Sequence, residues 1–138
     1  MINTTLSKAL ESLGVTRYTF AGSPKTEEEF YASFQLVQSI DEDTGATVYV
    51  DPANYSFTWA ELQAQYDAVA VEIAWEKLRA ERDRLLAETD WVVSRAVDAS
   101  NDGLGIQLPQ VWMDYRQALR DLPANTTDPS NPVWPTKP

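Results

Sequence analysis

The sequence of 138 residues contains neither cysteine nor histidine. Their absence excludes disulfide bonds, thiolate zinc sites, cysteine nucleophiles and histidine acid–base chemistry. An enzyme would have to work with carboxylates alone, which makes catalysis a remote third alternative among the possible functions. The composition therefore predicts a non-enzymatic protein with no catalytic residue, no metal and no cofactor.

Long apolar runs and an excess of positive charge are also missing. No stretch of about 18 apolar residues occurs, so we expect no transmembrane helix. Residues 1–8 lack a basic region followed by an apolar one, so we expect no signal peptide. The 21 acidic and 11 basic residues give a net charge of −10, which repels phosphate backbones and anionic lipids. Neither nucleic acid nor a membrane is an expected partner.

Residues 59–88 contain no glycine or proline and are rich in strong helix formers, which predicts one long helix. Thr58 and Glu61 form a capping box at its start. Its apolar residues fall into two stripes on opposite sides, namely Leu62, Tyr66, Val69 and Ile73, and then Val71, Trp75, Leu78, Leu85 and Leu86. Two stripes indicate that the first half packs on preceding residues and the second half on following residues. A helix enclosed by a single core is the alternative.

The first 57 residues predict a small α+β unit. The expected elements are a helix over 4–13 ended by Gly14, a strand over 16–20, a helix over 27–33 capped by Thr26, and a hairpin formed by 34–40 and 46–50. Asp41 to Gly45 have a partial resemblance to a calcium loop, but ligands are missing and a hairpin turn explains the same residues.

The residues after the long helix predict a helical hairpin. Thr89 and Asp90 are expected to cap a short helix over 91–97, and a second helix starts at Pro109 and ends at Pro123. Trp75, Trp91 and Trp112 are expected in the core, and Trp59, at the start of the long helix, is expected to pack on the hairpin. Acidic and basic residues of the two long helices are expected to form a structural ion-pair seam.

Four of the eight prolines lie in residues 124–138, which predicts an extended tail. The fold class is therefore α+β: a small N-terminal helix with antiparallel strands, a long helix, and a C-terminal helical hairpin with a Pro-rich tail. The expected domains are a small α+β unit over 1–57, the long helix and hairpin over 58–123, and the tail over 124–138.

The tail carries Val133 and Trp134, which can be interpreted in two ways. Trp134 either folds back and closes the helical bundle, which is the favoured interpretation, or inserts into a partner as an anchor. In the second case Val133 and Trp134 are the partner-binding residues. Tyr115, Arg116 and Arg120 are then the candidates for a surface that sets specificity.

Three segments of the C-terminal half, in this order, resemble the bacteriophage tail assembly chaperone family. They are residues 79–91, residues 112–123 with the order Trp-x-x-Tyr-Arg, and residues 133–138 with Val-Trp-Pro. The resemblance covers about residues 76–138, and versions of the family occur in tail fibre assembly proteins. The N-terminal half is similar to a leader found on some cyanophage versions.

The resemblance implies a protein that helps a phage tail or its fibres to fold or assemble, without ATP and without catalysis. Its partner would be a tail-fibre protein or another tail protein, and it would act in the host cell cytoplasm during assembly. The alternative is a structural component that stays in the virion tail as a fibre-associated or baseplate adaptor.

Overall fold

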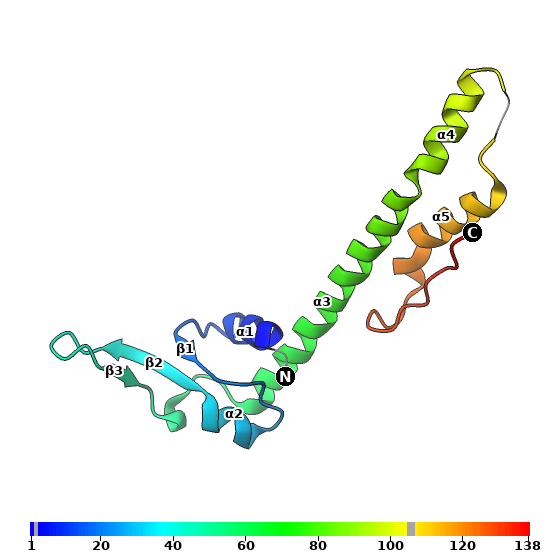
Figure 1. The fold of residues 1–138 in the computed structure, drawn as a ribbon. Helices are drawn as coiled ribbons and strands as arrows, with labels where there is room; N and C mark the ends of the chain where they lie inside the picture. Colours follow the sequence, from blue (N-terminus) through cyan, green and yellow to red (C-terminus); the bar gives the residue numbers. More distant parts are fainter. Residues whose placement is uncertain (2, 105–106) are drawn as a thin grey trace. The chain divides into compact units, whose positions relative to one another are not determined.

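The structure is a computed structural model that describes residues 1, 3–104 and 107–138 (Figure 1). It has the expected mixed α+β fold and is mostly helical. The chain divides into two compact units, Met1–Ala70 and Val71–Pro138. The division falls inside the long helix α3 (Trp59–Glu88), so each unit contains part of it. The domain boundaries expected at residues 57 and 123 stay predictions.

The N-terminal unit combines helices with a small antiparallel sheet in the order β1-β2-β3. Its elements are α1 (Asn3–Ser12), β1 (Tyr18–Thr19), α2 (Glu27–Ser33), β2 (Gln35–Ile40), β3 (Thr47–Tyr49) and the 3₁₀ helix η1 (Pro52–Asn54). The predicted helices and hairpin are confirmed. The strand expected over 16–20 is shorter, because only Tyr18 and Thr19 pair with β2.

Local sequence signals set the ends of these elements. Gly14 has a φ of +78°, and the Val15 N–H donates to the Leu10 carbonyl at 2.9 Å, which ends α1. In the hairpin turn, one Asp41 carboxylate oxygen accepts from the backbone N–H groups of Asp43 and Thr44 at 3.0 and 2.8 Å. These bonds hold the pKa of Asp41 below its usual value. The carboxylate therefore stabilises the turn, as the hairpin interpretation expects.

Aromatic rings form the centre of the N-terminal core. Phe30 is fully buried, and its ring stacks on Phe34 with centroids 4.6 Å apart. Phe57 packs edge-on against Phe30 at 6.2 Å. Around these rings lie the buried aliphatic residues Leu6, Ala9, Leu10, Val15 and Leu62. Helices α1 and α2 and the start of α3 therefore share one core.

Trp59 packs on this core, at a position that differs from the predicted one. Its ring centroid lies 5.5 Å from that of Phe30, so the indole packs on α2 rather than on the hairpin. The reason is that β3 is exposed along its whole length and offers no buried surface to an indole.

The predicted capping box opens α3. The Thr58 N–H donates to the Glu61 carboxylate at 2.8 Å, and the Glu61 N–H donates to the Thr58 hydroxyl at 3.3 Å. The Thr58 hydroxyl also donates to that carboxylate at 2.9 Å. Hydrogen bonds to the ionised form favour it, so the pKa of Glu61 is lower than usual.

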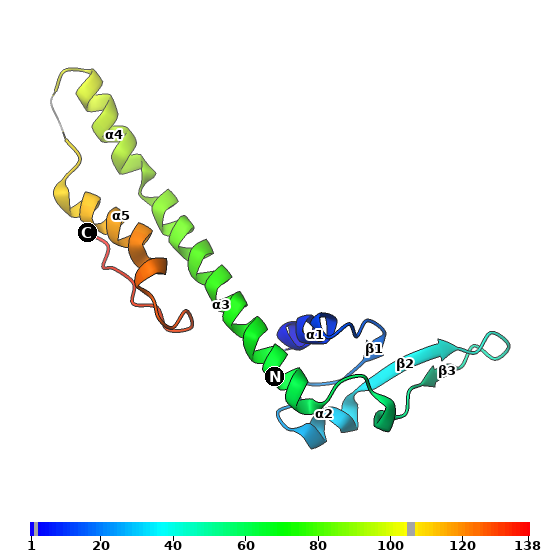
Figure 2. The same ribbon diagram turned by 180° about the vertical axis from the view of Figure 1, so that it is seen from behind.

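The C-terminal unit contains the remainder of α3, α4 (Asp90–Asn101), α5 (Gln110–Asn125) and the tail. In both views α5 runs beside the end of α3 and α4 in the opposite direction, as a helical hairpin requires (Figures 1 and 2). Helix α4 is longer than the expected 91–97, because its end is fixed later by Gly103 at φ +74°. Gly105, expected in the same loop, lies outside the described residues.

Pro123 does not end α5 as expected, since the helix continues to Asn125. Proline in the last turn removes only one backbone donor, and the following N–H groups can still bond to earlier carbonyls. Beyond the helix, Thr126 has an extended backbone and donates its hydroxyl to the Leu122 carbonyl at 2.7 Å. The last residues contain no helix or strand, as the prolines predict.

The aromatic core makes a direct prediction. We expect Phe30→Ala to lower the free energy of unfolding of the N-terminal unit by about 3–5 kcal/mol, because it leaves a cavity among the rings. Urea unfolding followed by far-UV circular dichroism measures this. Ile40→Ala is the control: its side chain is 65% exposed, so the change should stay within about 0.5 kcal/mol. Equal effects of the two substitutions would contradict this core assignment.

The capping box predicts a shift in titration. Thr58→Ala removes the hydroxyl but keeps the Thr58 N–H, so the pKa of Glu61 should rise part of the way towards its ordinary value. A carboxyl whose pKa is lowered in the folded state stabilises the fold above its unfolded pKa, and this contribution is lost as the pH falls. The variant should therefore show a weaker loss of stability in acid. Carboxyl-carbon NMR titration measures the shift, with Thr47→Ala as a control that leaves Glu61 unchanged.

Candidate functional site

The two units differ strongly in charge. Residues 1–70 contain ten acidic and three basic residues and carry a net charge of −7. Residues 71–138 contain eleven acidic and eight basic residues and carry only −3. Most of the acidity of the chain thus belongs to the N-terminal unit, and the C-terminal unit is close to balanced.

Most of the exposed large apolar side chains belong to the C-terminal unit. They are Val71, Trp91, Val97, Leu104, Val111, Met113 and Val133, against Ile40, Val48 and Tyr49 in the N-terminal unit. Several lie on α4 and at the start of α5. On α4 they lie on two sides, with Val97 beside one pocket and Trp91 beside another, and exposed apolar side chains of this kind can contact another protein.

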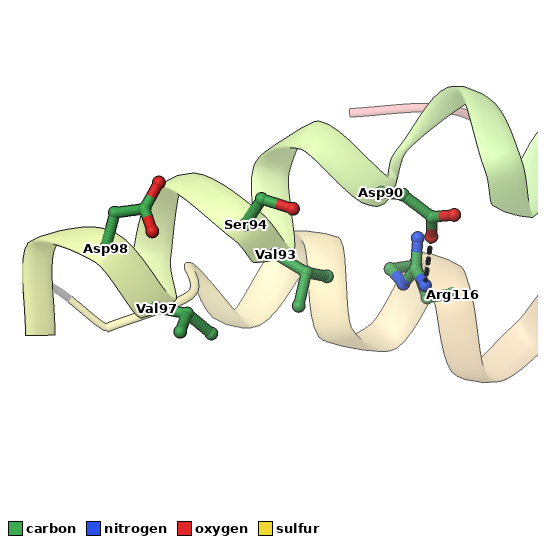
Figure 3. Close-up of a pocket in the computed structure, with 6 residues that line it drawn as sticks. All are labelled: Asp90, Val93, Ser94, Val97, Asp98 and Arg116. Atoms are coloured by element: carbon green, nitrogen blue, oxygen red, sulfur yellow. Dashed lines mark hydrogen bonds and ion pairs between the residues drawn. The ribbon is translucent and has the colours of Figure 1, made fainter. Parts of the chain in front are cut away.

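Arg116 joins α4 to α5, the two helices that carry several of these side chains. From α5, its Nη1 donates to the Leu86 carbonyl at 2.9 Å and to the Thr89 hydroxyl at 2.5 Å. Its Nη2 donates to an Asp90 carboxylate oxygen at 2.8 Å (Figure 3). Leu86 lies in the last turn of α3, where its carbonyl also accepts from the Thr89 N–H at 3.1 Å, and Asp90 is the first residue of α4. We call this set of bonds the Arg116 junction.

Thr89 belongs to the junction in a way that differs from the prediction. It was expected to cap α4, but its side chain makes no capping bond there. Its hydroxyl donates instead to the Leu86 carbonyl at 2.9 Å and accepts from Arg116, and the residue is fully buried. The hydroxyl faces back toward α3 because Arg116 requires an acceptor at that point.

Of the expected ion-pair seam between helices, the described residues form one pair, Arg116 of α5 with Asp90 of α4. The remaining helix-surface charges pair locally, for example Arg84 with Glu81 at 2.6 Å. Asp114 and Asp121 accept from glutamines one turn earlier in α5. These side chains are bound within their own helices, so the expected seam is limited to the Arg116–Asp90 pair.

A pocket beside the junction is lined by Val93, Ser94, Val97 and Asp98 of α4, with Asp90 and Arg116 (Figure 3). Arg116 is the only cation lining this pocket, and its guanidinium is already bound to Asp90 and to the junction acceptors. The arrangement therefore joins α5 to α4 and to the end of α3.

A second pocket lies on the other side of α4 and is mainly apolar. It has a volume of about 270 Å³ and is lined by Trp91, Val92, Arg95, Ala96, Gln107, Pro109 and Trp112. The rings of Trp91 and Trp112 meet edge to face with centroids 6.3 Å apart. We call it the tryptophan pocket.

Trp91 was expected in the core, and this prediction is wrong: the side chain is 57% exposed. The buried positions of α4 are Val92 and Ala99, seven residues apart and therefore on one face of the helix. Trp91 precedes Val92 by one residue, which turns it about 100° away from that face. Trp75 and Trp112 are half-buried, at the edge of the expected core.

The five predicted partner-binding residues do not form one exposed surface. Tyr115 is buried against Trp112, and Arg116 is only 11% exposed. Arg120 is exposed and makes a long hydrogen bond of 3.5 Å to Gln117. Val133 is 86% exposed, whereas the neighbouring Trp134 is half-buried. Partner binding by these residues stays a prediction, and its exposed part is Arg120, Val133 and the open side of Trp134.

The tail returns along the hairpin. In both views residues 126–138 run back beside α5 after a turn (Figures 1 and 2). Asp128 makes this turn by accepting from the Ser130 N–H at 2.9 Å and from the Asn131 side chain at 2.7 Å, which lowers its pKa. Lys137 then reaches Glu88 at the end of α3, with 3.6 Å between Nζ and the carboxylate oxygen.

The residues of the tryptophan pocket were missed by the sequence interpretation. Trp91 and Trp112 lie at apolar helix positions, which favours the core interpretation. A signal was available in Ala96: a small residue on a helix leaves room beside a neighbouring tryptophan. In the described part of the chain, no cluster of three or more His, Cys, Asp or Glu could hold a metal. No helix there is both long and apolar enough to cross a membrane.

The Arg116 junction predicts a specific loss of stability. Arg116→Met keeps the aliphatic stem but removes all the donors, so we expect a loss of about 2 kcal/mol in the free energy of unfolding. Arg116→Lys should not restore it, because an ammonium cannot place donors at these acceptors as the planar guanidinium does. Arg120→Met is the matched control and should change stability by no more than about 0.5 kcal/mol. If Arg120→Met costs as much as Arg116→Met, the junction is not a stabilising element.

Residues 75–138 match the family model described as phage tail assembly chaperone protein. The match covers somewhat less than half of the chain and includes the second half of α3, α4, α5 and the tail. No curated protein and no solved structure matches the chain. The matched region contains both the Arg116 junction and the tryptophan pocket. The chain is therefore similar, from Trp75 onward, to phage tail assembly chaperone proteins.

Proposed function

We propose that this protein is a non-catalytic chaperone that binds a phage tail protein, most specifically a tail-fibre protein, before assembly. The single observation that carries the proposal is the family match over residues 75–138. The chaperone would act in the host cell cytoplasm while the tail is built, and it would need neither ATP nor a cofactor.

The distribution of apolar side chains supports binding through the C-terminal unit. An unassembled tail protein exposes apolar surface that is later covered by its neighbours in the tail. A chaperone with its own exposed apolar side chains can cover that surface by simple association, since apolar burial stabilises a complex. Trp91, at 57% exposure, is the residue type that most often dominates such contacts.

The tail of the chain offers a second contact. Val133 and Trp134 would anchor the client, and Arg120 would add a charged contact on the exposed side of α5. Tyr115 and Arg116 would act indirectly, because they are held inside the hairpin and position α4 against α5. The five predicted residues thus divide into three that touch the client and two that hold the surface in place.

The charge of the N-terminal unit suits a protein that must release its client. With a net charge of −7 in residues 1–70, copies of the chain repel one another and repel nucleic acid. The chaperone therefore stays soluble while its C-terminal unit exposes apolar side chains. A client held only by association leaves when its assembly neighbours bind it more tightly.

Co-expression with the tail-fibre and other tail proteins of the same phage tests the proposal. One of these proteins should become soluble and co-purify with this chain, and purified virions should then lack the chain on protein gels. A fixed copy number in the virion would instead identify a structural adaptor. Failure of every tail protein to bind or gain solubility would contradict the chaperone function.

Val133→Ser tests the anchor separately. The side chain is 86% exposed, so its loss should leave thermal unfolding unchanged. Binding to the client, measured by isothermal titration, should weaken about fivefold, which corresponds to about 1 kcal/mol. Val48→Ser in the N-terminal unit is the matched control and should bind like the unchanged protein. Equal affinity of both variants would remove Val133 from the binding surface.

A further inference from the structure

The tryptophan pocket has an unusual charge environment for this chain. Among its seven lining residues, Arg95 is the only charged one. The chain as a whole has 21 acidic residues, yet none of them lines this pocket. Across the described part of the chain, Arg95 makes no hydrogen bond or ion pair. As far as the described residues go, its guanidinium is therefore available to bind an external group.

The size and walls of the pocket fit one side chain. Its volume of about 270 Å³ lies just below the roughly 300–1,000 Å³ that is usual for pockets that hold small molecules. Trp91 and Trp112 both line the pocket and form an edge-to-face pair, so two indoles supply aromatic surface to an incoming group. Val92, Ala96 and Pro109 complete an apolar wall. Such a wall favours a large aliphatic or aromatic side chain.

The guanidinium of Arg95 adds a second requirement for the ligand, namely a negative charge. A guanidinium binds a carboxylate through two parallel N–H bonds, and this geometry is more selective than that of an ammonium. Arg95 stands one turn after Trp91 on α4, so the two side chains lie next to each other on the helix surface. An apolar side chain seated between the tryptophans would thus carry a carboxylate on an adjacent residue close to Arg95.

We propose that the tryptophan pocket receives a client segment that presents one aromatic or large aliphatic side chain directly next to an aspartate or glutamate. This inference rests on the proposed function, because it assigns that client a recognition signal. Recognition depends on charge complementarity with Arg95: a basic segment is repelled, and a neutral segment lacks the ionic contact.

The chain itself is a poorer occupant. The tail lies along α5 and is tied to Glu88 by Lys137, and no residue of 126–138 lines the pocket. A second copy would bring its own N-terminal unit with a net charge of −7 into the complex, which opposes association. Self-association is therefore an outcome that would count against the proposal.

Three peptides with one changed feature test the recognition signal on the full-length protein. Acetylated and amidated heptapeptides with the centres Asp-Phe-Asp, Asn-Phe-Asn and Lys-Phe-Lys share the same Gly and Ser flanks. Binding is followed through the indole N–H signals of Trp91 and Trp112 in ¹H–¹⁵N NMR, assigned with single Trp→Phe variants. The Asp peptide should shift these two signals with a dissociation constant at least fivefold lower than that of the Asn peptide, and the Lys peptide should bind weakest.

Charge reversal at one position makes the test specific. Arg95→Gln should abolish the difference between the Asp and Asn peptides, and Arg95→Glu should invert the order so that the Lys peptide binds best. Lys77→Glu is the matched control: it reverses a charge on the exposed surface of α3, outside the pocket, and should keep the original order. Thermal unfolding of all three variants shows that the fold is kept.

Three results would overturn the proposal: equal affinity for the three peptides, shifts confined to indoles other than Trp91 and Trp112, or sedimentation that shows dimers formed through the pocket. Co-expression separates this failure from a failure of the proposed function. If Arg95→Glu still keeps the tail protein soluble, the chaperone function stands and the pocket is not the recognition site. If the peptides bind as expected but no tail protein is held, the recognition chemistry stands and the client class is wrong.

Discussion

The guanidinium of Arg116 is the contact on which the C-terminal unit depends. It donates to the end of α3 through Leu86, to the buried Thr89 between the helices, and to the start of α4 through Asp90. At the break between the two helices, the Leu86 carbonyl already accepts from the Thr89 N–H at 3.1 Å and from the Thr89 hydroxyl at 2.9 Å. Arg116 adds a charged donor to this carbonyl and to the Thr89 hydroxyl, and these bonds fix α5 against the break.

The junction and the tryptophan pocket share the same two short segments. Trp91 follows Asp90 directly, and Trp112 lies one turn before Arg116 on α5. The contact that joins Arg116 to Asp90 therefore lies directly beside the residues of the tryptophan pocket. In the proposed function, these polar contacts would hold the binding surface in one arrangement. A preformed surface loses less conformational freedom when a client binds.

Much of the fold could be predicted because its signals are local. Capping boxes at Thr26 and Thr58, the left-handed glycine at position 14 and the uninterrupted stretch over 59–88 each act within a few residues. The errors concern contacts between distant residues. The sequence alone could not show that Thr89 faces Arg116 rather than its own helix, or that Trp91 leaves the core. The charge of Arg95 carries meaning only once its neighbours in space are known to be neutral.

Hydrogen exchange on the complex with a co-purified tail protein tests most directly whether the client is held by the C-terminal unit. Backbone amides of α4 and of the first turns of α5 should exchange more slowly when the client is bound, and amides of β2 and β3 should keep their rates. Slower exchange confined to the N-terminal unit would contradict the account, because the client would then be held by the region that the family match does not include.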